Sequence, residues 1–289
     1  MIEVNLTRAI DPYRSFQDFR HHGNDPGTDL TGSSFKIDFA SNGSVRSLRV
    51  EWTATPTASV FATADHDLSA LHRLMSSDAT DPYPPLLDRI RIDEPLSRWL
   101  RLDRQLIMPS SGDVWRELVP SILGQRITSV EAARQWHRLN GATGNDPSPE
   151  NILKLSFADF HRIGVEENRA STIKRCARRQ DLLRRLNNAP VEDAYSSLVA
   201  IPGVGAWTLA ETLRRSHGWQ DAVSVGDFHL RNVVTYALTG NRSGTDEVML
   251  KLLEPFRPFR AVVIAAIRHH SPSAERRQPG LANPDIRRF

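Results

Sequence analysis

Residues 198–210 have the sequence LVAIPGVGAWTLA, which predicts the end of one helix, a tight turn and the start of a second helix. Gly203 and Gly205 permit backbone conformations and close approaches that a Cβ atom would prevent. The second helix would begin with unpaired N–H groups and the positive end of its dipole. This geometry can bind a phosphate, although a lone Pro-Gly-Val-Gly sequence is more often a plain connecting turn.

A second informative segment follows about twenty residues later, where residues 223–231 read VSVGDFHLR. The apolar run ends in Gly226-Asp227, and a helix through Val233, Val234 and Leu238 is predicted after it. Asp227 is well placed to be a helix N-cap. A carboxylate at that place is also kept ionised by the helix dipole, as is needed beside a developing cation. Both interpretations remain open from the residues alone.

Residues 121–125, SILGQ, form a third segment upstream of these two. In order and spacing the three resemble the helix-hairpin-helix (HhH-GPD) DNA glycosylase superfamily, and within it the bacterial 3-methyladenine DNA glycosylase II branch. The likeness extends over residues 105–270, and the N-terminal segment resembles that branch's extra domain more faintly.

The resemblance implies that a damaged nucleotide is rotated out of double-stranded DNA and that its glycosidic bond is hydrolysed. Asp227 would then stabilise the oxocarbenium-like sugar and assist the attacking water. Main-chain carbonyls of Val199, Ile201 and Val204 would hold a structural Na⁺ or K⁺ at the hairpin. The residues expected to contact DNA are Gln125, Arg126, Gly203, Val204, Gly205 and Ala206.

Trp207 decides the subclass that the resemblance implies. Bifunctional members place a nucleophilic lysine at this position, and the sequence has no lysine between Lys174 and Lys251. We therefore expect a monofunctional enzyme that leaves an abasic site. The counterpart of Trp207 in the branch forms part of the base pocket, and core packing is the alternative role.

Three positions depart from the best-known member type. Arg126 stands where that type has an apolar wedge, so it would fill the gap left by the flipped base or contact a phosphate. Glu211 and Arg268 replace aromatic residues of the base pocket. They could pair with each other, or Glu211 could bond to the base and change the lesion preference.

Hydrophobic periodicity predicts a mainly α protein with a small N-terminal α+β domain. Period-2 runs lie at residues 2–6, 35–39, 45–52 and 59–62, and a helix from Asp65 ends before the proline-rich residues 81–85. We expect an α+β domain over 1–85, two helical subdomains over 86–270 with the active-site cleft between them, and a surface tail over 271–289. Residues 171–186 are predicted to form one basic helix.

Composition limits the other possibilities. The 289 residues are 39% hydrophobic and 25% charged, as in ordinary globular proteins. With one cysteine, Cys176, a disulfide within the chain and a four-cysteine Fe–S cluster are both excluded. The adjacent pairs His21-His22 and His269-His270 lack the spacing of helical zinc ligands. We expect a cytoplasmic, nucleoid-associated monomer with no membrane span and no required cofactor.

Lysine and arginine total 37 residues against 34 acidic ones, and nearly all the basic residues are arginine. Arginine suits phosphate binding, but the bias can also come from a GC-rich genome. The expected function is removal of damaged, alkylated purines in base excision repair. The alternatives are a glycosylase for a deaminated base or bulky adduct, and a DNA-binding protein without catalysis.

Overall fold

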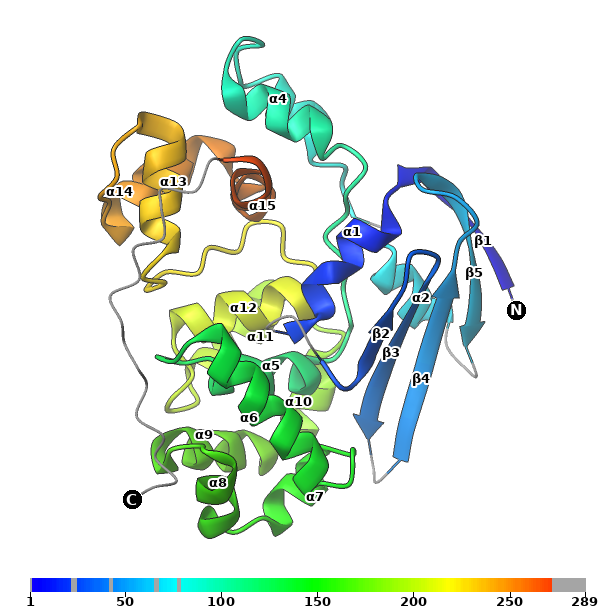
Figure 1. Ribbon diagram of the computed structural model, residues 1–289, viewed down its shortest axis with the longest axis vertical. Coiled ribbons are helices and arrows are strands. Elements are labelled where there is room, and N and C mark those ends of the chain that lie inside the picture. Colours follow the sequence, from blue (N-terminus) through cyan, green and yellow to red (C-terminus); the bar gives the residue numbers. More distant parts are fainter. Residues whose placement is uncertain (1, 22–24, 42–43, 65–67, 77–78, 272–289) are drawn as a thin grey trace.

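The computed structural model describes residues 2–21, 25–41, 44–64, 68–76 and 79–271. Its elements gather around three large hydrophobic cores, one beneath a β-sheet and two among helices, and a small cluster of alanines forms a fourth. In Figure 1 the sheet lies to the right, one group of helices lies below and the other lies at the upper left. The mainly helical fold with a small N-terminal sheet confirms the class expected from the sequence.

The sheet is antiparallel, with strand order β1-β5-β4-β3-β2. Its alternating pattern faces inward, since Phe35 pairs with Val50, Ile37 pairs with Leu48, and all four side chains are buried. Helical residues such as Phe16 and Leu71 complete this core. The elements are β1 (Ile2–Ile10), α1 (Pro12–Phe16), η1 (Gln17–Phe19), β2 (Thr28–Leu30), β3 (Ser34–Ser41), β4 (Ser44–Glu51), β5 (Thr57–Ala64) and α2 (Leu68–Leu74).

The four expected strands are present, and the short β2 is an addition that the pattern did not predict. The helix expected after Asp65 is α2, while Asp65 itself lies outside the described residues. Three-residue β2 is too short for an alternating pattern to show in the sequence, so its place depends on pairing with β3.

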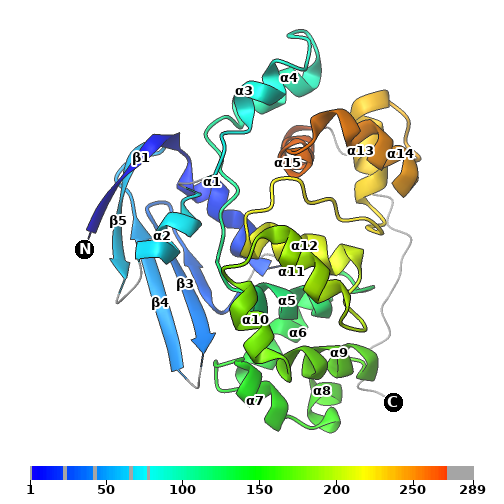
Figure 2. The same cartoon turned by 180° about the vertical axis from the view of Figure 1, so that it is seen from behind.

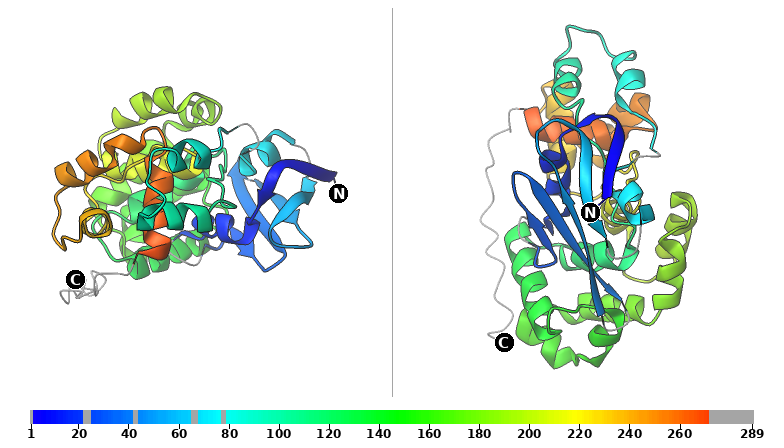
Figure 3. Two further views of the ribbon diagram at one scale, coloured as in Figure 1. Left: turned by 90° about the horizontal axis from the view of Figure 1, so that it is seen from above. Right: turned by 90° about the vertical axis from the view of Figure 1, so that its right-hand side faces the viewer.

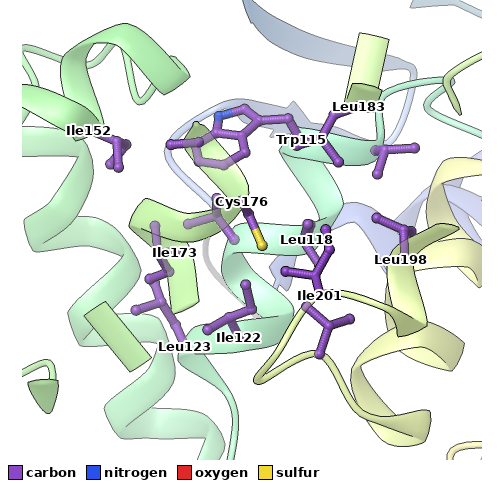
Figure 4. Packing of buried hydrophobic residues seen from close by; sticks show 14 of the residues in the cluster. Trp115, Leu118, Ile122, Leu123, Ile152, Ile173, Cys176, Leu183, Leu198 and Ile201 are labelled. Atoms are coloured by element: carbon purple, nitrogen blue, oxygen red, sulfur yellow. The ribbon is translucent and has the colours of Figure 1, made fainter. Parts of the chain in front are cut away.

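The first helical core packs around α5, whose residues are all buried. Figure 4 shows Trp115, Leu118 and Ile122 of this helix surrounding Cys176. Burial raises the pKa of the Cys176 thiol to about 12, so this cysteine is an inert core residue. The helices are α5 (Val114–Leu123), α6 (Ser129–Ala142), α7 (Pro149–Lys154), α8 (Phe157–Ile163), α9 (Glu167–Ala177), α10 (Gln180–Leu186), α11 (Val191–Val199) and α12 (Ala206–Ser216).

The single basic helix expected over residues 171–186 is wrong, because the chain forms α9 and α10 with a break between them. The N–H of Arg179 bonds to the Cys176 carbonyl in a tight turn. This turn redirects the chain so that Leu183 and Leu186 enter the core beside Cys176. Apolar spacing alone did not reveal the break.

The second helical core combines two segments that are far apart in the sequence. Tyr83, Leu86 and Leu100 pack against Val234 and Ile267, and Figure 2 shows α3 and α4 beside α15. Prolines 84 and 85 fall in the first turn of α3, where a missing N–H costs little. The helices are α3 (Tyr83–Leu87), α4 (Pro95–Leu102), α13 (Leu230–Thr239), α14 (Asp246–Leu253), η3 (Glu254–Phe256) and α15 (Arg260–His270).

The expected tail begins at Ser271, and its remaining residues lie outside the described part of the chain. None of the helices described has both the length and the apolar character that crossing a bilayer requires.

A buried ionic cluster joins the sheet domain to α5. The His21 ring contacts Asp25 through Nδ1 and Glu117 through Nε2, the latter at 2.6 Å. Arg116 contacts Asp25 at 3.1 Å and Glu117 at 2.9 Å. Burial would lower the pKa of His21, but the two carboxylates outweigh burial and raise it. His21 is therefore an imidazolium that balances two buried anions.

We expect this cluster to make stability depend on pH. Because the folded pKa of His21 exceeds its ordinary value near 6.5, its contribution is complete below that pH and is lost as the pH rises through the raised pKa. In urea unfolding, the free energy should therefore fall above pH 7, and His21→Gln should lower it by about 3 kcal/mol at pH 6. His137→Gln, on the exposed side of α6, is the control. Equal pH slopes for wild type and His21→Gln would contradict the assignment.

Candidate active site

The hairpin between α11 and α12 has the turn that the sequence predicts. Gly203 has a φ of +95°, and a Cβ atom there would lie 2.2 Å from Thr172 Oγ1 on α9. The turn therefore needs glycine both for its left-handed conformation and for its contact with α9. Val204 turns its side chain into the first helical core, which anchors the hairpin from within.

Neither backbone strain nor crowding within the protein requires glycine at position 205. Its φ of −100° is ordinary, and an added Cβ would meet no atom within 4 Å. Gly203, Gly205 and Ala206 are exposed. No side chain caps α12 at Gly205, so its first N–H groups face outward with the positive end of the helix dipole. The exposed turn can hold a phosphate through main-chain donors.

The loop after α5 is attached directly to this hairpin. Gln125 donates from Nε2 to the Gly203 carbonyl at 2.9 Å and to Thr208 Oγ1 at 2.8 Å. Its neighbour Arg126 is exposed and has a φ of +57°, a conformation that costs a non-glycine residue energy. Gln125 thus holds the loop to the hairpin, and the next residue, Arg126, is exposed.

Two of the three carbonyls expected to hold a monovalent cation accept fewer hydrogen bonds than their neighbours in the turn. Arg175 donates to the Pro202 carbonyl and Gln125 to that of Gly203. Among the described residues, no hydrogen bond ends on the carbonyls of Val199 or Val204, and that of Ile201 accepts only the Val204 N–H. Neutral carbonyl oxygens are ligands that a hard cation prefers, and Val199 adds the C-terminal end of α11, so the donor set fits.

Asp227 lies at the start of α13 and has two roles in the geometry. Its Oδ1 accepts the N–H groups of His229 and Leu230, both at 2.9 Å, so it caps the helix. Its Oδ2 lies 3.7 Å from the Arg268 guanidinium of α15. Gly226, with a φ of +90°, donates its N–H to Asp246 at 3.1 Å and fixes the turn. Asp227 thus bonds the N–H groups at the start of α13 from two residues ahead of the N-cap position, His229, while Oδ2 accepts neither of them.

A cavity of about 320 Å³ opens where the three cores meet. The sheet domain lines it through α1 and η1, the first helical core through α12, and the second through α15. Figure 3 shows α1 reaching from the sheet toward the helices. Glu211 and Arg268 line the cavity as expected, whereas half-buried Trp207 is not among the lining residues.

Glu211 is buried in an ionic network that joins α12 to the sheet domain. Its carboxylate accepts from Ser224 and contacts Arg214 at 3.3 Å and Arg215 at 3.0 Å. Both arginines also contact Asp18 of η1. Burial would raise the pKa of Glu211, but the arginines outweigh it and hold the pKa far below its usual range. The described residues show no ion pair between Glu211 and Arg268, since Glu211 is held by Arg214 and Arg215 while Arg268 lies 3.7 Å from Asp227.

Several residues of the cavity wall were not predicted to lie together. Asp103 receives Arg14 at 2.6 Å and His269 and His270 at 2.8 Å each. Three ligand atoms here lie within 4.8 Å of one another, but the Arg14 guanidinium already occupies the carboxylate as a cation would. This cluster fastens α1 and α15 to the end of α4. Such convergence of distant segments cannot be seen in one sequence.

The comparisons with known proteins agree with this geometry. The family model described as "HhH-GPD superfamily base excision DNA repair protein" matches residues 119–258. In this segment the chain is similar to the HhH-GPD superfamily. The matched part of the chain includes α12, the hairpin and Asp227. No curated protein sequence matches the chain.

Solved structures of DNA glycosylases share the fold. A 3-methyladenine DNA glycosylase from Archaeoglobus fulgidus gives a TM-score of 0.74 at 16% identity, over 93% of this chain and 98% of that one. A Clostridium acetobutylicum 8-oxoguanine glycosylase/lyase with double-stranded DNA gives 0.64 at 10%, over 93% and 98%. A Schizosaccharomyces pombe 3-methyladenine DNA glycosylase with abasic DNA gives 0.51 at 22%, over 55% and 80%. The chain therefore has the fold of HhH-GPD glycosylases.

The two hairpin glycines should respond differently to alanine. Gly203→Ala should lower the free energy of unfolding by about 2 kcal/mol, because it combines a left-handed φ with a collision against Thr172. Gly205→Ala, the matched control, should leave stability nearly unchanged and weaken only DNA binding. Urea unfolding and DNA titration of both variants measure this. Equal loss of stability in the two variants would refute the separation of roles.

Proposed function

We propose that the protein is a monofunctional DNA glycosylase that removes a damaged purine from double-stranded DNA and leaves an abasic site. The observation that carries the proposal is Asp227, whose Oδ1 is fixed by two backbone N–H groups. Asp227 itself does not line the cavity, but its Oδ2 lies 3.7 Å from Arg268, which does. The exposed hairpin and the loop at Arg126 supply the DNA contacts, through Gln125, Arg126 and the main chain of residues 203–206.

The chemistry follows from the position of Asp227. Cleavage of the N-glycosidic bond builds positive charge on the sugar, and an ionised carboxylate nearby stabilises that charge. The same carboxylate orients a water for attack at the anomeric carbon. A monovalent cation held by the carbonyls of Val199, Ile201 and Val204 would add positive charge toward the DNA phosphate. The cation takes no part in bond cleavage.

Absence of lyase activity is proposed from the lysine positions. Among the described residues that line the cavity there is no lysine, and Trp207 occupies the position where the resemblance implies one in bifunctional enzymes. Lys174 donates to the carbonyls of Leu153 and Leu155 in the first helical core. The described lining residues therefore offer no amine that could form a Schiff base with the sugar.

Alkylated purines are the substrate class that the resemblance implies, as in the 3-methyladenine branch. A deaminated purine is the second candidate, and the cavity wall favours it, because Glu211 and Arg268 stand where aromatic residues would hold a cationic base. Trp207 remains a proposed pocket residue that would contact the base once DNA is bound.

The test is excision from duplexes that carry 7-methylguanine, hypoxanthine or uracil. Strand breaks should appear only after alkali, since the enzyme leaves an abasic site. Asp227→Asn should lower the single-turnover rate by about a hundredfold or more. Because asparagine is also a good N-cap, the stability and DNA affinity of the Asp227→Asn variant should stay near those of wild type. Excision retained by Asp227→Asn would remove Asp227 from catalysis, and breaks without alkali would indicate a lyase.

Arg126 gives an independent test of the DNA-binding face. Arg126→Gly relieves the left-handed strain, so stability should change by less than about 1 kcal/mol. Affinity for lesion DNA should fall, and the slope of log K against log salt should decrease by about 1 if the guanidinium contacts a phosphate. Lower affinity with an unchanged salt dependence would indicate that Arg126 fills the gap left by the flipped base instead of contacting a phosphate. Unchanged affinity would exclude both roles.

A further inference from the structure

The carboxylates on the cavity wall are already satisfied by cations of the protein. Three of them have an arginine or histidine partner within 3.6 Å. The fourth, Asp81, accepts the Tyr83 N–H at 3.2 Å and lies 4.0 Å from Arg8. None of them therefore needs a donor from a bound base. The carboxylates are Asp18, Asp81, Asp103 and Glu211.

Arg268 differs from the other charged groups of the wall. Its side chain is 46% exposed, and its only ion pair among the described residues is the contact with Asp227 at 3.7 Å, beyond hydrogen-bond length. A guanidinium has five N–H donors in a planar fork. Arg268 therefore has unused donor capacity, and it both lines the cavity and touches the proposed catalytic carboxylate.

The position of Arg268 has an electrostatic consequence for Asp227. A fixed positive charge 3.7 Å from the carboxylate opposes the cation that must develop on the sugar. Catalysis therefore gains when Arg268 turns from Asp227 toward the cavity. A base that offers hydrogen-bond acceptors would favour this turn, and a cationic base would oppose it.

Resting on the proposed glycosylase function, we propose that Arg268 determines specificity by recognising O6 and N7 of a neutral 6-oxopurine, and that this contact frees Asp227 for catalysis. Bidentate binding of arginine to O6 and N7 is the commonest specific contact between proteins and purines. An N-alkylated cationic purine is disfavoured by charge. Tyr83 is the one Phe, Tyr or Trp among the described lining residues, and it already faces Arg8 at 5.5 Å.

The test compares hypoxanthine with 7-methylguanine, which keeps O6 but has a blocked N7 and a positive charge. In single-turnover assays, the wild-type enzyme should excise hypoxanthine at least about tenfold faster than 7-methylguanine. Arg268→Ala should lower the hypoxanthine rate about tenfold and raise the 7-methylguanine rate. Arg268→Lys keeps the charge without the fork, so it should lose hypoxanthine excision and still discriminate against 7-methylguanine. Arg98 is exposed on α4 and does not line the cavity, so Arg98→Ala should leave the ratio of hypoxanthine to 7-methylguanine excision rates unchanged.

A binding measurement separates this inference from the glycosylase function itself. In the Asp227→Asn background, Arg268→Ala should reduce the preference for hypoxanthine duplex over 7-methylguanine duplex. If the enzyme excises 7-methylguanine and Arg268→Ala leaves the ratio of hypoxanthine to 7-methylguanine excision unchanged, the inference about Arg268 is wrong. The proposed glycosylase function would still stand. Binding preference that depends on Arg268, without excision of any lesion, would support recognition and overturn the catalytic proposal. Binding that ignores Arg268 would refute recognition in either case.

Discussion

The buried carboxylate of Glu211 is the interaction on which the cavity depends. It lies on α12, the helix that follows the hairpin. Arg214 and Arg215 connect it to Asp18 of the sheet domain. An ionised group at this depth is stable only because several partners surround it, and removal of one partner leaves charge unpaired. The network therefore fixes the distance between α12 and η1. The cavity is the space left between those two elements and α15.

The same carboxylate gives the base pocket a different chemistry from an aromatic one. A side chain held by two arginines and a serine is rigid, polar and unavailable for proton transfer. The proposed catalytic carboxylate is instead Asp227, which two backbone N–H bonds hold in one orientation. In the proposed function, structural support and catalysis are therefore divided between two carboxylates.

The local features of the site were predictable from sequence, because each depends on residues close together in the chain. Gly203 and Gly205 indicated the hairpin, and Gly226-Asp227 indicated a capped helix after an apolar run. The partners across the cavity were not predictable. Asp18, Asp103 and Arg14 meet α12 and α15 only through the packing of three cores, and no periodicity encodes that meeting. For the same reason the residues alone left open whether Glu211 pairs with Arg268.

The second helical core also constrains how the chain acquires its structure during synthesis. Tyr83, Leu86 and Leu100 leave the ribosome long before Val234 and Ile267, the residues against which they pack. The first helical core, over residues 114–213, can form completely in the interval. Helices α3 and α4 must keep their apolar faces exposed until α13 and α15 emerge, so this lobe closes last and is the part most open to misassembly or chaperone binding.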